Sequence, residues 1–110
     1  MVELRSYIDE NGTKVFSQWF EQLEPEAAAK VTMALTRLEF GNFSNVKGVG
    51  SGVFEYKIDF GPGYRIYFGK DGASLVILIG GGTKKRQQQD IAAALECWAA
   101  YKRRKKEKSR

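Results

Sequence analysis

The residues best suited to chemistry are two cations and a phenol in the middle of the chain. Lys57 lies in segment 53–60, where polar and apolar residues alternate, and Arg65 and Tyr67 lie in segment 64–68, which alternates in the same way. Side chains of a strand point alternately to its two faces, and a Gly-Pro-Gly turn joins the two segments. The spacing therefore predicts that Lys57 and Arg65 share one face of adjacent antiparallel strands, with Tyr67 two residues further along.

More cations follow the next apolar segment. Residues 74–79 are almost continuously apolar, as expected for a central strand, and three glycines separate them from Thr83 and the basic run Lys84, Lys85 and Arg86. In an antiparallel meander, the end of such a strand can lie close to the preceding hairpin. We therefore expect one shallow face that carries several cations and one phenol.

Such a face suits the cleavage of RNA. Attack by a 2′-hydroxyl on the neighbouring phosphate passes through a pentavalent phosphorane with extra negative charge, which fixed Arg and Lys donors stabilise more than they stabilise the ground state. We expect Arg65, Lys57 and Lys84 to supply these donors, and an arginine can hold two phosphate oxygens at once. Tyr67 could stack on a base, or move a proton if the surrounding cations lowered its pKa.

The same residues also have a purely structural interpretation. Lys57 and Arg65 could pair with Glu55 and Asp59 across the strands, as is common on exposed sheet faces. Tyr67 could serve only to pack the sheet. The residue pattern leaves both interpretations open.

The composition excludes several kinds of site. The chain has 110 residues, no histidine and one cysteine, Cys97. It therefore cannot build a Ser-His-Asp triad, a Cys-His dyad or an intrachain disulfide, and zinc would lack its soft ligands. We expect no metal and no cofactor, so that acid–base chemistry must rest on Lys, Arg, Tyr or carboxylates. Without a recognisable secretory signal, and with no apolar run longer than residues 75–79, the expected location is the cytoplasm and no membrane partner is expected.

The net charge of +5 is distributed unevenly. Residues 102–110 contain seven basic residues and one acid, and residues 41–86 contain seven basic residues and three acids. This pattern favours a polyanion such as RNA or DNA, although a solvated tail without a specific ligand would look the same. We interpret residues 1–101 as one domain and residues 102–110 as a mobile basic tail. The residues expected to bind nucleic acid are Lys57, Arg65, Lys84, Lys85, Arg86, Lys102, Arg103 and Arg104.

The segments around these residues predict an α+β fold. Residues 2–8 are expected to form a strand, and helices are expected over residues 13–23 and from Pro25 to the residue before Gly41. Residues 43–52 are glycine-rich and predict a loop, after which three strands and a last helix follow. The predicted order is β-α-α-β-β-β-α, with the helices packed on one face of a mainly antiparallel sheet and the polar face left open.

Two strings in this framework resemble the RelE/ParE superfamily of toxins. The first is Gly-Tyr-Arg-Ile-Tyr-Phe at residues 63–68, and the second is Gly-Gly-Gly-Thr-Lys-Lys-Arg at residues 80–86. Together they are most similar to the phage-derived Gp49-like, HigB-related branch, often described as addiction-module killer proteins. The resemblance covers nearly the full chain, because the predicted order of elements agrees with the RelE-like fold.

The resemblance implies the toxin of a type II toxin–antitoxin module, neutralised by a cognate antitoxin that is here a helix-turn-helix protein. RelE-like members enter the ribosomal A site and cleave mRNA, using basic residues of the central sheet and a C-terminal Tyr or His. Carried over by motif, the basic residues are Lys57, Arg65 and either Lys84 or Lys85. The partners implied are therefore the ribosome and mRNA.

Two departures from the family pattern leave alternatives open. Some members carry a second lysine on the strand of Lys57, and the residue at that position is Asp59 here. The C-terminal acid–base residue has no match in residues 87–90, so that Tyr67 or Tyr101 would have to substitute. The leading interpretation is a ribosome-dependent mRNA endonuclease that inhibits translation. The alternatives are a ParE-like toxin that acts on DNA gyrase without nuclease activity, and a nucleic-acid-binding regulator that is not toxic.

Overall fold

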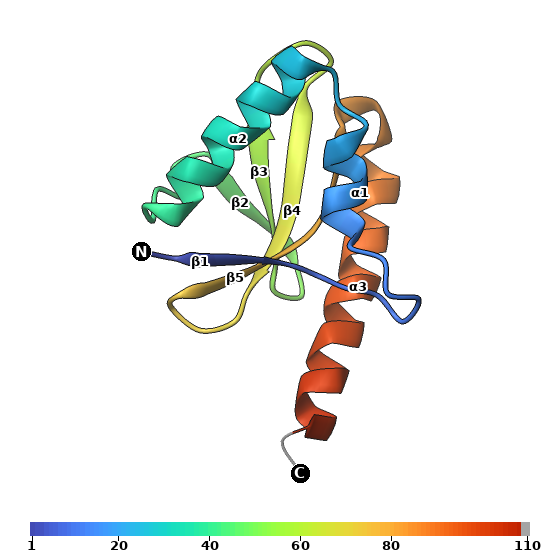
Figure 1. Cartoon of the computed structure of the whole chain (residues 1–110). Coiled ribbons are helices and arrows are strands. Elements are labelled where there is room, and N and C mark those ends of the chain that lie inside the picture. The colour runs from blue at the N-terminus through green and yellow to red at the C-terminus, as the bar shows by residue number, and fades with distance from the viewer. Residues whose placement is uncertain (109–110) are drawn as a thin grey trace.

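The alternating and amphipathic segments fold into five strands and three α-helices over residues 1–108, which the computed structural model describes (Figure 1). The strands are β1 (Glu3–Ser6), β2 (Val46–Gly50), β3 (Val53–Ile58), β4 (Tyr64–Lys70) and β5 (Leu75–Thr83). The helices are α1 (Val15–Glu21), α2 (Pro25–Glu39) and α3 (Gln87–Lys108), and a short 3-10 turn, Lys84–Arg86, joins β5 to α3. Among these described residues, no helix combines the length and the apolar character needed to cross a membrane.

One mixed sheet contains the strands in the order β1-β5-β4-β3-β2. β1 runs parallel to β5, and the other neighbours are antiparallel. The predicted α+β class and the mainly antiparallel sheet are therefore confirmed. The predicted order is one strand short, because β2 forms within the glycine-rich segment expected to be a loop, where Val46 lies opposite Tyr56 and Gly50 lies opposite Val53.

Helices cover both faces of the sheet, and the prediction that they share one face is wrong. α1 and α2 pack on the face that carries Tyr56, Ile66 and Phe68, which are almost fully buried. On the opposite face, Trp98 of α3 belongs to a second buried cluster that includes Tyr67. Figure 1 shows α2 and α3 on opposite sides of β3 and β4. The apolar stripe of α3 needs a partner, and α1 and α2 already fill the first face.

α3 is longer than the sequence predicts. It continues to Lys108, so the segment expected to be a mobile basic tail is helical over its described residues. Residues 109–110 belong to the same predicted tail and lie outside the described residues. Lys and Arg are good helix formers, and no Gly or Pro interrupts this segment, so the helix has no local reason to stop at residue 101.

Side-chain contacts attach the second half of α3 to the rest of the fold. The Tyr101 hydroxyl donates to Oδ2 of Asp71 at 2.6 Å. Arg104 donates to the Ile8 carbonyl at 3.1 Å and to the Tyr7 hydroxyl at 3.3 Å. The last turns of the helix extend past the sheet, as Figure 1 shows. Some of its cations are thus held in place, and only the C-terminal turns of the helix project from the body.

Candidate nucleic-acid interface

Two of the cations that the sequence singles out lie opposite each other on adjacent strands, and a third follows the next strand. Lys57 of β3 is opposite Arg65 of β4, which is opposite Gly82 of β5. The predicted adjacency of Lys57 and Arg65 is therefore confirmed. β5 extends through the three glycines to Thr83, and this extension brings Lys84 to the turn between β3 and β4.

The turn between β3 and β4 connects Arg65 to Lys84. The Gly63 carbonyl accepts a hydrogen bond from the Lys84 backbone N–H at 2.8 Å and another from Nη1 of Arg65 at 3.4 Å. Gly63 has a φ of +80°, and a Cβ at this position would lie 3.2 Å from Nη1 of Arg65. The positive φ therefore favours glycine in this turn, and a larger residue would also require the Arg65 guanidinium to shift slightly. Lys57, Arg65 and Lys84 are called the cation cluster below.

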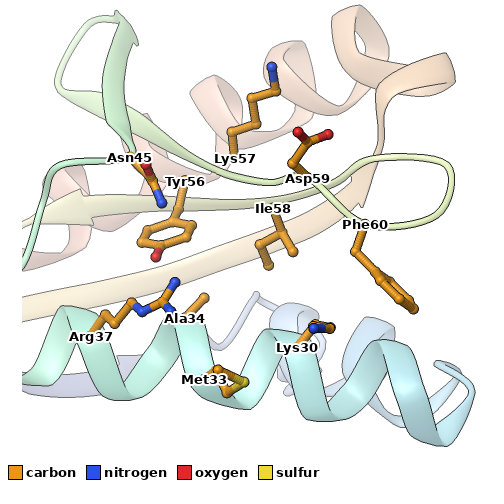
Figure 2. Close-up of a pocket in the computed structure, with 10 residues that line it drawn as sticks. All are labelled: Lys30, Met33, Ala34, Arg37, Asn45, Tyr56, Lys57, Ile58, Asp59 and Phe60. Atoms are coloured by element: carbon orange, nitrogen blue, oxygen red, sulfur yellow. The ribbon is translucent and has the colours of Figure 1, made fainter.

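The members of the cation cluster differ in exposure. Lys57 and Lys84 are exposed, and Figure 2 shows the Lys57 side chain pointing away from α2. Lys85 and Arg86, which complete the 3-10 turn, are exposed as well. Arg65 is only 4% exposed. The predicted open polar face is therefore wrong for Arg65, although Lys57 and the basic turn remain available to a ligand.

Arg65 is buried in a polar contact network on the face that α3 covers. Its Nε lies 3.7 Å from Oε2 of Glu55, whose side chain is 1% exposed. The other carboxylate oxygen of Glu55 lies 3.7 Å from Nζ of Lys47. Gln87, the first residue of α3, donates from Nε2 to Oε2 of Glu55 at 2.9 Å. The alternative in which Arg65 pairs with Glu55 is therefore confirmed.

Tyr67 packs in the interior and does not face a ligand. It is 1% exposed and lies in the cluster of buried residues that includes Trp98 of α3. Burial raises the pKa of the Tyr67 phenol above its ordinary value, and the neighbouring Glu55 carboxylate raises it further. The lowered pKa needed for proton transfer is therefore contradicted, and the packing interpretation of Tyr67 is confirmed.

The sequence does not indicate two polar residues of the site, Lys47 and Gln87. It suggests only a structural role for a third, Glu55. Glu55 is predicted only as a possible counter-ion, although the alternation of segment 53–60 places it on the face of Arg65. Lys47, with 67% of its side chain exposed, lies opposite Glu55 in β2 and is hidden in the segment read as a loop. Gln87 lies in residues 87–90, where the sequence has no Tyr or His and indicates no other role. No motif marks either Lys47 or Gln87.

The basic residues of the predicted tail do not join the cation cluster. Lys102, Arg103 and Arg104 are exposed on the second half of α3. At roughly 1.5 Å per residue, Lys102 lies about 22 Å along the helix from Gln87. A ligand that touches both groups must therefore be extended, as a nucleic-acid strand is.

Asp90 packs against the sheet beside the cation cluster. A Cβ at Gly82 would collide with the Asp90 carboxylate, so the glycine makes room for it. Burial raises the pKa of the Asp90 carboxyl, and the nearby Arg86 opposes part of that rise. Its Oδ2 is buried and has no hydrogen-bond partner among the described residues. The charged form of Asp90 is therefore held at a cost to stability.

We expect Asp90→Asn to raise the free energy of unfolding at pH 7. The pKa of Asp90 in the folded state lies above its ordinary 3.8, so the folded chain binds this proton more tightly than the unfolded chain. The stability linked to that proton is present below the unfolded pKa and is lost as the pH rises through the folded pKa. Urea unfolding should thus show an advantage of the variant that grows from about pH 3 to pH 7. An advantage of equal size at both pH values would contradict this assignment.

The groups in this region are donors and carboxylates without a metal-binding arrangement. Within residues 1–108, no three His, Cys, Asp or Glu side chains are grouped so that they could hold a metal ion. The exposed groups are ammonium and guanidinium donors above a buried ion pair. Chemically, such an arrangement can bind anions and can stabilise negative charge that develops on them.

Comparison with known proteins places the chain in a family. No family model matches it. It is similar to a protein of Haemophilus influenzae (strain ATCC 51907 / DSM 11121 / KW20 / Rd), with 43% identity over 68 residues that make up 61% of this chain and 69% of that protein. The chain belongs to the same family as this Haemophilus influenzae protein. That relative is described as an uncharacterized protein, so its description gives no activity.

Proposed function

We propose that the chain is the toxin of a type II toxin–antitoxin module, of the RelE/ParE type, and that it cleaves mRNA on the ribosome. The observation that carries this proposal is the convergence of Lys57, Arg65 and Lys84 at the ends of three neighbouring strands. The positive net charge supports a polyanionic target. The two sequence strings at residues 63–68 and 80–86 meet in this cluster, which supports the resemblance to HigB-related toxins.

In the proposed reaction, the exposed lysines of the cation cluster contact the phosphate. Lys57 and Lys84 donate to its oxygens and stabilise the charge that grows as the 2′-oxygen, its proton passing to water, bonds to phosphorus and the 5′-oxygen of the next nucleotide leaves. Arg65 is held on its Nε side by Glu55 and directs Nη1 to the Gly63 carbonyl, so it adds positive charge from within the sheet. Lys85 and Arg86 bind the flanking phosphates. Tyr67 takes no part, because its phenol is buried.

The proposed partners follow from the same surface. A cognate antitoxin, proposed to be a helix-turn-helix protein, neutralises the chain by offering acidic groups to the cation cluster or by covering α3. The ribosome supplies an extended polyanion that can reach the cluster and the distant cations Lys102, Arg103 and Arg104 together. We place this activity in the cytoplasm, where ribosomes and mRNA meet.

One observation favours a second candidate function. Arg65 and Tyr67 are both buried, and no residue is assigned as general base. A ParE-like toxin, which binds DNA gyrase without cutting nucleic acid, needs no such base. It would use the exposed lysines only to bind its target.

Induced expression in growing bacteria tests the proposal and separates it from the second candidate. We expect growth to stop and amino-acid incorporation to fall within minutes, and co-expression of the antitoxin to restore both. Incorporation of thymidine should fall later, because DNA synthesis is not the target. Early induction of the DNA-damage response with continued protein synthesis would favour the gyrase alternative and count against mRNA cleavage.

A further inference from the structure

A pocket lies beside the free end of β3, on the side of the sheet that faces α2. β2 begins at Val46, and just before it the Lys57 N–H donates to the Asn45 carbonyl at 3.2 Å. Beyond this link, the edge of β3 that pairs with β2 has no strand neighbour among the described residues. A pocket of about 250 Å³ opens here between β3 and α2 (Figure 2). It is called the α2–β3 pocket below.

The floor of the α2–β3 pocket is apolar and its rim is partly so. Tyr56 and Ile58 point toward α2 in Figure 2, and both are at least nine-tenths buried. Met33 on α2 is 50% exposed at the rim. A flat ring could lie on this floor against the flexible thioether of Met33.

Two cations of α2, Lys30 and Arg37, line one side of the same pocket. Lys30 lies with Nζ 5.4 Å from the ring centroid of Phe60, and Arg37 forms no salt bridge with any described residue. Asp59 is the one acid among the described residues that line the pocket. An anionic group is therefore favoured beside the apolar floor.

Asn45 adds a group that can read the edge of a ring. Its side chain enters the pocket beside Tyr56 in Figure 2, and no described residue forms a side-chain hydrogen bond with it. An amide offers donors and an acceptor together, which is the combination that pairs with the edge of a nucleobase. The pocket thus combines an apolar floor, an amide and the cations Lys30 and Arg37.

The pocket is continuous with the face that carries the cation cluster. A neighbouring hollow of about 550 Å³ is lined by Lys47 on one side and shares Asn45, Lys57 and Asp59 with the α2–β3 pocket. The Lys57 side chain touches both hollows and points away from α2. A chain that leaves the pocket around the free edge of β3 therefore arrives at Lys57.

We propose that the α2–β3 pocket binds one unstacked nucleotide of a single-stranded RNA, with the base on the Tyr56 floor and the adjoining phosphate passing to Lys57. Arg37 holds the other phosphate of this nucleotide, on the α2 side, and Asn45 contacts the base edge. This proposal rests on the proposed RNA target and adds a subsite that places the strand relative to the cation cluster. Duplex RNA keeps its bases stacked inward and does not fit.

Binding of two probes to the purified full chain tests the subsite. The probes are adenosine 5′-monophosphate, followed by NMR chemical shifts, and a labelled single-stranded RNA octamer, followed by fluorescence anisotropy. We expect the mononucleotide to shift signals of Met33 and Asn45, and we expect Arg37→Glu to weaken octamer binding at least tenfold. Lys14→Glu makes the same charge change at an exposed position outside the pocket and should weaken binding much less. Asn45→Ala should alter the order of affinities for the four 5′-mononucleotides.

The outcomes separate the subsite from the proposed function. Equal octamer binding by Arg37→Glu and Lys14→Glu would overturn the subsite, even if the wild type arrests translation. Shifts confined to the pocket with adenosine 5′-monophosphate would support it, even if translation continues and the toxin proposal fails. Shifts with an acidic peptide but not with nucleotides would overturn it in favour of a protein ligand. If neither the mononucleotide nor the octamer bound, the subsite would be overturned as well.

Discussion

Replacement of Arg65 by alanine is expected to lower the free energy of unfolding by about 3 kcal/mol. The substitution leaves Glu55, which is 1% exposed, without its buried cationic partner. Breaking a buried ion pair on one side is strongly destabilising, because the remaining charge stays desolvated. The expected loss lies at the low end of the usual range, because Lys47 and Gln87 still contact the carboxylate. Urea denaturation followed by circular dichroism measures the change.

Lys57→Ala is the matched control for this prediction, since Lys57 is exposed directly opposite Arg65. Its loss should cost under about 1 kcal/mol. Combining Arg65→Ala with Glu55→Gln should recover part of the lost stability, because the carboxylate charge is removed as well. If Arg65→Ala were no more destabilising than Lys57→Ala, the Glu55–Arg65 pair would have no stabilising role.

Replacement of Lys57 or Lys84 by alanine is expected to reduce the inhibition of translation by roughly a hundredfold each. Removing one fixed donor to a charge that develops in the transition state typically costs about 3 kcal/mol of barrier, which corresponds to this factor. Both side chains are exposed, so the fold should survive either substitution. The initial rate of protein synthesis in a cell-free system, titrated with each purified variant, measures the effect.

The control for this second prediction is Lys14→Ala, which removes an exposed lysine outside the cation cluster. It should inhibit translation as strongly as the wild type, because it removes no donor from the cation cluster. Its change in net charge equals that of Lys57→Ala or Lys84→Ala. Equal inhibition by Lys57→Ala, Lys84→Ala and Lys14→Ala would show that the lysines act only through long-range attraction. The cation cluster would then have no role in the reaction.

Local patterns were sufficient to predict the central hairpin and the meeting of its cations. Strict alternation in segments 53–60 and 64–68, with glycines in the turn, determines which side chains share a face. Lys57 opposite Arg65 follows from that period and is confirmed. The position of Lys84 beside the turn follows from the meander, although the extension of β5 through three glycines is not visible in the sequence.

Burial of the same face could not be predicted, because it depends on which helix covers which side. The polar residue types Glu55, Arg65 and Tyr67 at alternate positions predict a face exposed to solvent. The stripe of α3 shows that the helix needs an apolar surface but does not say which one. The packing of Trp98 beside Gly69, where a Cβ would collide with the indole, shows in the structure that α3 lies on this side. The same burial raises the pKa of Tyr67, so the option that surrounding cations lower it does not apply.

The missing strand and the helical tail have different physical causes. β2 contains Gly48 and Gly50, which have low strand propensity, and its existence depends on pairing with β3. The basic end of α3 has no apolar periodicity, so a pattern search ends the helix too early. Arg104 and Tyr101 contribute contacts to distant residues, which a local pattern does not contain.

The most direct test of the central claim is primer extension on an mRNA held by translating ribosomes after addition of the purified protein. We predict new 5′ ends at codon boundaries that appear only when ribosomes are present, and that weaken about a hundredfold with Lys57→Ala or Lys84→Ala. The same ends should remain with Lys14→Ala. Intact mRNA at protein concentrations that stop growth in cells would contradict the account, and gyrase-dependent DNA breaks at those concentrations would replace it with the binding-toxin alternative.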